Sequence, residues 1–163
     1  MQLDIVKLPA KILRSKAHDV TFPLDKNTAK LLTNMLETVA RVDGIGLAAN
    51  QVASPLNLAL IYLEHMDVPA FPIINPEMIE VSKEQVEIEE GCLSLPGVFG
   101  LVSRPKKIKI KYQNADGSTE IIEDDGWVAR VIQHEVDHLN GILIKDKMKK
   151  VTKGEEKLST FTG

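Results

Sequence analysis

The sequence has little cysteine, little net charge and no long apolar run, and each shortage excludes a class of protein. Only one of the 163 residues is a cysteine, Cys92. A lone thiol cannot form an internal disulfide, which excludes a disulfide-stapled secreted scaffold and fits a reducing compartment. The longest apolar stretch, 56–63, is too short to cross a bilayer and is interrupted by Asn57. The first residues lack the charged and then apolar pattern of a signal peptide. We therefore expect a cytoplasmic protein without a membrane partner.

The charge balance argues against a large nucleic-acid-binding surface. Lys and Arg number 20 and Asp and Glu 23, which gives a formal net charge of −3. We expect no DNA partner on this ground. The alternating lysines at 107, 109 and 111 could touch RNA, but a solvated strand face is the default interpretation. The lysines between 145 and 153 could support transient docking on a ribosome, on charge alone.

No repeat, low-complexity tract or Gly/Ser linker divides the chain, and its length is enough to bury a core. We predict a single domain over residues 1–163. The last stretch, 145–163, is polar and lysine-rich, so we assign it no regular structure and treat it as a potentially flexible tail.

Two segments predict helices. Between residues 27 and 42 apolar residues recur at helical spacing, with Asn27 or Thr28 as cap and Asp43-Gly44 as the end. A second helix is predicted over 125–139, since Asp124 and Asp125 favour its start and Asn140-Gly141 its end.

The region between these helices predicts strands. Lys106 to Tyr112 alternates between apolar and lysine residues, as a half-buried strand does, and Asp116-Gly117 marks a hairpin turn. Other strand segments are expected at 57–63, at 73–74, at 78–90 (one or two strands) and at 119–122. This order predicts an α+β fold, with antiparallel sheets packed around the helix in the C-terminal half.

The strongest chemical signal is His134-Glu135-Val136-Asp137-His138 on the second predicted helix. Residues four apart lie on one helix face, so both imidazoles can reach a single metal ion with Glu135 beside them as acid and base. The alternative is a solvated helix face that carries two unrelated histidines, but the spacing favours the metal.

Two histidines do not complete a catalytic metal site, which usually has three protein ligands and an open position for water. One protease class has a histidine six residues further on, where this chain has Ile144, and another uses a downstream glutamate. Glu155 and Glu156 lie in the polar tail, where no helix would aim them. The remaining soft ligand is Cys92, in a loop rich in Gly and Pro. A lone cysteine is otherwise a small buried hydrophobe.

Three segments together resemble the peptide deformylase family. They are Gly44-Ile45-Gly46-Leu47-Ala48-Ala49-Asn50-Gln51, Glu90-Gly91-Cys92-Leu93-Ser94 and Gln133-His134-Glu135-Val136-Asp137-His138, in the family's order. Ile74-Asn75-Pro76-Glu77 and Asp116-Gly117 add to the similarity, which covers roughly residues 1–145. The resemblance implies an enzyme that removes the formyl group from N-formylmethionyl peptides of nascent proteins and releases formate.

The resemblance also implies the roles of individual residues. The metal ligands are Cys92, His134 and His138, and Glu135 is the proton shuttle. The Gln51 amide and the Leu93 N–H stabilise the oxyanion. The substrate-binding residues it implies are Ile45, Gly46, Ile88, Gly91, Trp127 and Val131. The implied physiological metal is Fe²⁺, while these ligand types also accept Zn²⁺, Ni²⁺ or Co²⁺.

The sequence departs from the family pattern at several positions. Asn50 replaces a frequent proline, Ala53 a frequent glycine, and Phe99 an arginine that some members have. Two other functions remain open on the residues alone. A metallopeptidase would need a different third ligand, and a structural metal domain would need a fourth ligand, for which His18 and His65 are the spare candidates.

Overall fold

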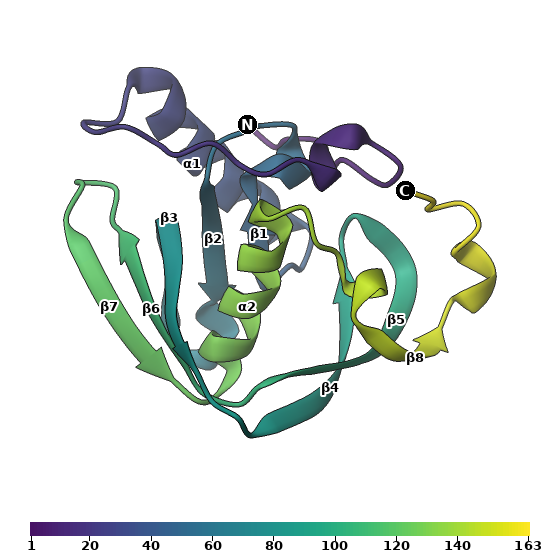
Figure 1. Ribbon diagram of the computed structural model, residues 1–163. Coiled ribbons are helices and arrows are strands. Elements are labelled where there is room, and N and C mark those ends of the chain that lie inside the picture. Colours follow the sequence, from purple (N-terminus) through teal and green to yellow (C-terminus); the bar gives the residue numbers. More distant parts are fainter.

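Two antiparallel sheets lie on either side of helix α2 (Trp127–Leu139), as Figure 1 shows. The computed structural model describes all residues, 1–163. The first sheet has the order β1 (Gly46–Ala48), β2 (Leu58–Leu63), β3 (Val68–Val81), β6 (Ile108–Gln113) and β7 (Thr119–Asp124). The second has the order β4 (Gln85–Cys92), β5 (Leu95–Pro105) and β8 (Met148–Lys153). This arrangement confirms the predicted α+β class.

Both predicted helices are present, with shifted ends. Helix α1 (Lys26–Arg41) begins one residue earlier than expected, because the Asp25 side chain caps it by accepting the Thr28 N–H at 2.7 Å. The left-handed residue after α1 is Asp43, at φ 55°, and not the glycine that the sequence suggested. Gly44 is needed for space instead, since a Cβ there would lie 2.9 Å from Val39.

Helix α2 begins at Trp127, two residues later than predicted. The Asp124 carboxylate accepts the N–H groups of Gly126 at 2.9 Å and of Ala129 at 2.7 Å, and so satisfies amides that the first turn leaves free. The helix ends at Asn140 and Gly141 as predicted, with Gly141 at φ 75°.

The first sheet packs its apolar face on α2. Along β6, Ile108, Ile110 and Tyr112 are buried in the same cluster as Ala129 and Ile132 of the helix. The predicted hairpin at Asp116-Gly117 joins β6 to β7. The segment expected as a short apolar piece at 73–74 is the middle of the 14-residue strand β3.

The predicted strand region 78–90 contains two strands that belong to different sheets. β3 ends at Val81 in the first sheet, and β4 begins at Gln85 in the second. The chain thus crosses at 82–84 and places the second sheet on the other side of α2 (Figure 1).

The C-terminal segment corrects an expectation. Residues 145–163, to which we assigned no regular structure, contain β8 and a short 3₁₀ turn, Glu155–Lys157. β8 pairs with β5, and Met148, Leu158 and Phe161 pack against a buried cluster that includes Leu8, Leu13 and Val102. Burial of these few apolar residues orders the segment although most of its residues are polar.

None of the helices is long and apolar enough to cross a membrane.

Candidate active site

A cysteine and two histidines from distant parts of the sequence meet between β4 and α2. One ligand atom each of Cys92, His134 and His138 lies within 4.8 Å of the others, and Cys92 Sγ is 3.2 Å from His138 Nε2. Cys92 is the last residue of β4, and the histidines lie one turn apart on α2. Their sulfur and imidazole donors are the ligand types that divalent transition metals accept. The predicted ligands therefore come together as a set that fits a metal ion.

The outer nitrogen of His134 is held by a carboxylate. His134 Nδ1 lies 2.8 Å from Glu90 Oε1, which leaves Nε2 free for the ligand set. A ligating histidine commonly donates its other N–H to a carboxylate, which fixes its tautomer and orientation. Burial opposes ionisation of Glu90, but hydrogen bonds from His134 and Arg104 outweigh it and lower the pKa of Glu90 to about 2. Glu90 is therefore a constant anion at neutral pH.

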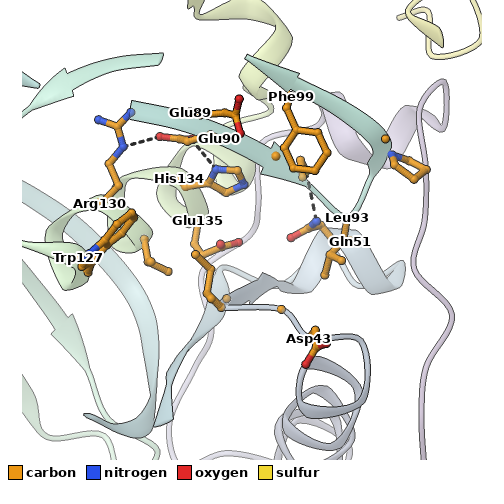
Figure 2. Close-up of a pocket in the computed structure, with 18 residues that line it drawn as sticks. Asp43, Gln51, Glu89, Glu90, Leu93, Phe99, Trp127, Arg130, His134 and Glu135 are labelled. Atoms are coloured by element: carbon orange, nitrogen blue, oxygen red, sulfur yellow. Dashed lines mark hydrogen bonds and ion pairs between the residues drawn. The ribbon is translucent and has the colours of Figure 1, made fainter. Parts of the chain in front are cut away.

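Two buried arginines surround Glu90. Arg104 of β5 donates to Glu90 at 2.7 and 3.0 Å and to Asp137 at 2.7 Å. Arg130 of α2 has its Nε 2.6 Å from Glu90 Oε2 (Figure 2). It also donates to the backbone oxygens of Val86, at 2.9 Å, and of Val102. Because buried charges need partners, this set of opposite charges holds its members in place.

Gln51 is fixed so that its amide nitrogen faces the cysteine. Its Oε1 accepts the Ala48 N–H at 3.0 Å, while its Nε2 lies 3.1 Å from Ser94 Oγ and 3.7 Å from Cys92 Sγ. The Leu93 N–H donates no hydrogen bond to a backbone carbonyl. The Leu93 N–H thus remains available for a substrate oxygen, whereas the Gln51 amide would have to exchange one of its contacts with Ser94 or Cys92 for a contact to that oxygen.

Glu135 is buried, and its Oε1 has no hydrogen-bond partner in the chain. Burial raises the pKa of Glu135 to about 7, against the opposing effect of His134. A carboxyl group with a pKa near neutrality exchanges protons readily at working pH. Gly46 packs directly on it, since a Cβ at this glycine would lie 2.6 Å from Glu135 Oε2.

In the absence of a metal, the pKa values of the two histidines are shifted in opposite directions. Burial, and then the charge of His134, lower the pKa of His138 well below its usual range. Burial also lowers the pKa of His134, but Glu135, Cys92 and Glu90 together raise it well above that range. With a raised pKa, His134 carries a proton on each ring nitrogen near neutral pH. A metal ion would have to displace the proton on Nε2, so metal binding would depend on pH.

A cavity of about 500 Å³ opens beside these residues (Figure 2). In Figure 2, His134 and Glu135 lie on one side of it and Gln51 and Leu93 on another. The predicted site residues in its wall are Ile45, Gly46, Gln51, Gly91, Cys92, Leu93, Trp127, Val131, His134 and Glu135. His138 is buried behind the wall. Ile88 lines a smaller neighbouring cavity of about 190 Å³, which shares Trp127 and Arg130 with the first.

Comparisons with known proteins agree with this geometry. The model of the polypeptide deformylase family matches residues 2–154. The chain belongs to the peptide deformylase family. The peptide deformylase of Thermotoga maritima is 45% identical over 139 residues, which are 84% of this chain and 81% of that protein.

Solved deformylase structures have the same fold. The crystal structure of peptide deformylase from Thermotoga maritima has a TM-score of 0.86 at 40% identity and covers 91% of this chain and 99% of its own. A Met-Ala-Ser-bound class I type b deformylase from Acinetobacter baumannii has a TM-score of 0.84 at 33% identity, with the same coverage.

This deformylase is thus a hydrolase that removes the N-formyl group from nascent peptides, and its family consists of metalloenzymes. The metallopeptidase and structural-metal alternatives are wrong. His18 and His65 do not belong to the ligand group, which leaves it with three members.

The sequence analysis did not find the two arginines of the site. Arg104 is 2% exposed and occupies an inward position of β5, in step with the buried Val98 and Val102. A charged residue on the apolar face of a strand signals a buried partner. The Gly- and Pro-rich sequence before Arg104 does not predict a strand, so the inward position of Arg104 cannot be recognised from the sequence.

Proposed function

We propose that this deformylase acts on N-formylmethionyl peptides with one Fe²⁺ held by Cys92, His134 and His138, and that it releases formate. The observation that carries the proposal is the meeting of these three donors beside the buried carboxylate of Glu135. Cys92, His134 and Glu135 line the cavity, and His138 lies buried behind them. Three protein ligands leave a coordination position free, as catalysis requires.

When held by Cys92, His134 and His138, the metal would act as a Lewis acid and would lower the pKa of a bound water toward 7. The donor set accepts Zn²⁺, Ni²⁺ and Co²⁺ as well as Fe²⁺. We choose Fe²⁺ on family resemblance, and an oxidisable thiolate beside ferrous iron makes the activity oxygen-sensitive.

Glu135 moves the proton. It accepts a proton from the attacking water and delivers it to the leaving amine, for which a pKa of about 7 is suited. As the formyl carbonyl becomes tetrahedral, its oxygen gains negative charge. Gln51 Nε2 and the Leu93 N–H donate to that oxygen, and one such donor is typically worth about 3–4 kcal/mol in the transition state.

The substrate lies between the edges of two sheets. β1 and β4 are both edge strands. Gly46 of β1, Ile45 directly before it and Gly91 of β4 line the same cavity. An extended peptide can pair with such edges through its backbone. The methionine side chain enters the apolar part at Val131 and Trp127, with Ile88 behind Trp127. Methionine is flexible and apolar, so such a pocket accepts it and partly tolerates other apolar residues.

We also propose cytoplasmic action with transient contact to the ribosome. The support is the set of exposed lysines on β8, namely Lys149, Lys150 and Lys153. Clustered cations favour contact with a phosphate backbone.

Formate release from formyl-Met-Ala-Ser by anaerobically prepared protein, with metal analysis of the same sample, tests the proposal. We expect about one iron per chain and no cleavage of unformylated peptides. Cys92→Ala should lose the metal and the activity together. Full metal occupancy in that variant would show that another residue is the third ligand.

A further inference from the structure

We propose that Arg104 is a positioning residue for the metal ligands: it sets the spacing between β4, which carries Cys92, and α2, which carries both histidines. This inference rests on the proposed ligand set. Arg104 makes no hydrogen bond to any of the three ligands and does not line the cavity. It acts through the two carboxylates that it binds.

Those carboxylates are placed next to the ligands on both elements. Glu90 precedes Cys92 by two residues in β4, and Asp137 precedes His138 by one in α2. Arg104 Nε and Nη2 donate to the two oxygens of Glu90 at 2.7 and 3.0 Å, and Nη1 donates to Asp137 at 2.7 Å. One side chain from β5 therefore joins the strand half of the ligand set to the helix half.

The guanidinium suits this task because it is planar. Its N–H groups form a rigid fork, so a carboxylate on each side is fixed relative to the other. Arg104 is 2% exposed, and its partners have side-chain exposures of 8% and 15%. Because a buried charge without partners is costly, the arrangement has few alternatives. A lysine at this position would keep the positive charge but could not donate in fixed directions to both Glu90 and Asp137.

Arg130 also joins α2 to β4, but substituting it would not separate ligand spacing from substrate binding. It lines the substrate cavity and holds the first half of the helix through the carbonyls of Val86 and Ile88. Arg104 acts at the other end, near His138. Variants at Arg104 and Asp137 therefore test ligand spacing without replacing a residue that lines the cavity.

The experiment uses the Co²⁺-loaded protein. Arg104→Met, Arg104→Lys and Asp137→Asn are compared with the control Lys147→Met. The Lys147 ammonium is 2.9 Å from Asp137 Oδ2, the oxygen that also accepts from Arg104, but it makes no ion pair with Glu90 and so does not join α2 to β4. The Co²⁺ absorption spectrum, the dissociation constant from chelator competition and the thermal unfolding of each metal-free chain are measured.

We expect Arg104→Met and Asp137→Asn each to weaken Co²⁺ binding by about 10–100-fold, as loss of an outer partner does. Both should shift the ligand-field bands, with Arg104→Lys in between. Because the two residues form one bridge, the double variant should lose less than the product of the single effects. Lys147→Met should bind Co²⁺ as the parent does.

A lower melting temperature in Arg104→Met with parental Co²⁺ affinity and spectrum would reduce Arg104 to a stabilising residue and overturn the inference. If Arg104→Met does not fold, Asp137→Asn decides by the same two measurements. A parent without a thiolate-to-Co²⁺ band would overturn the ligand assignment itself, and this inference with it. A parent with the band and unchanged variants would overturn this inference alone.

Discussion

At the scale of single residues, the site depends on a carboxyl group that is buried beside two imidazoles and yet has an oxygen free. Glu135 Oε1 has no partner within the chain, and Gly46 closes the other side of the carboxylate. The group is thus held in position by packing, and it stays available to a substrate.

Glu135→Gln tests the role of this carboxyl group. The amide keeps the size of the side chain but cannot carry the proton, so formate release should fall by at least about 10²-fold. The metal content should stay at the parental level, because Glu135 is not among the three ligands. Formate release and metal analysis on one sample check both. Near-normal turnover would remove Glu135 from the mechanism.

Gly46→Ala tests the packing around Glu135. The added methyl group would lie 2.6 Å from Glu135 Oε2 and 2.9 Å from Val131 Cγ1, so one of them must move. We expect a lower kcat by about tenfold or more, since displacement of a proton-transfer group by 1 Å can cost about 10²-fold. Metal content should be unchanged. Parental kcat would mean that the carboxylate position is not critical.

The local pattern was sufficient to predict some site residues but not others. His134, Glu135 and His138 follow from helical spacing. The choice of Cys92 as the third ligand follows from the lack of another soft ligand. The partners Arg104 and Asp137 lie 33 residues apart on two elements, and no local rule connects them. They become visible only when β5 and α2 are packed.

At the scale of elements, a partly exposed ion pair joins the N-terminal segment to the chain after α2. Arg14 donates to Asp146 at 2.6 and 3.0 Å, and Asp146 also accepts the Leu143 N–H at 3.0 Å. The hydrogen bond from Arg14, aided by that from Leu143 and opposed by partial burial, lowers the pKa of Asp146.

The pH dependence of this contact follows from the sign of the shift. A carboxyl group with a lowered folded-state pKa stabilises the fold above its unfolded pKa, about 4, and this stabilisation is lost as pH falls through the folded value. Asp146→Asn should cost about 1 kcal/mol at pH 7, because the pair is partly exposed. The difference from the parent should shrink near pH 3. Urea unfolding with a chelator present at both pH values measures it, and an equal difference at both would contradict the assignment.

The sequence predicted the elements with strong periodicity. Both helices, β2, β6 and the β6–β7 hairpin were predicted, because their burial pattern is local. β1, β5 and β8 were not. β1 has three residues, β5 has Pro96, Gly97 and Gly100 within it, and half of β8 is lysine, so each depends on a distant partner.

At the scale of the whole molecule, the lysines fall into two groups with different surroundings. On β6 and the turn before it, Lys107 is 3.3 Å from Glu123, and Lys109 pairs in register with Glu80 and Glu123. On β8, Lys149 is 4.0 Å from Glu87, and Lys153 lies 5.4 Å from the Phe99 ring at the cavity wall. The second group therefore leaves more positive charge for a polyanion.

This difference predicts where a ribosome would bind. Replacing Lys149, Lys150 and Lys153 by Gln should reduce co-sedimentation with ribosomes, and binding of the parent should weaken as salt increases. The control replaces lysines 107, 109 and 111 by Gln, which removes the same number of charges. Formate release from a free tripeptide should be equal in all three proteins. Equal loss in both variants would refute a specific β8 contact.

The single cysteine has a practical consequence. Cys92 lines the cavity, and no other thiol exists in the chain. A thiol-selective maleimide dye added to the native protein can therefore react with Cys92 Sγ only, and a bound cation would shield that sulfur. The fraction of chains labelled after a short pulse therefore measures the fraction that holds no cation.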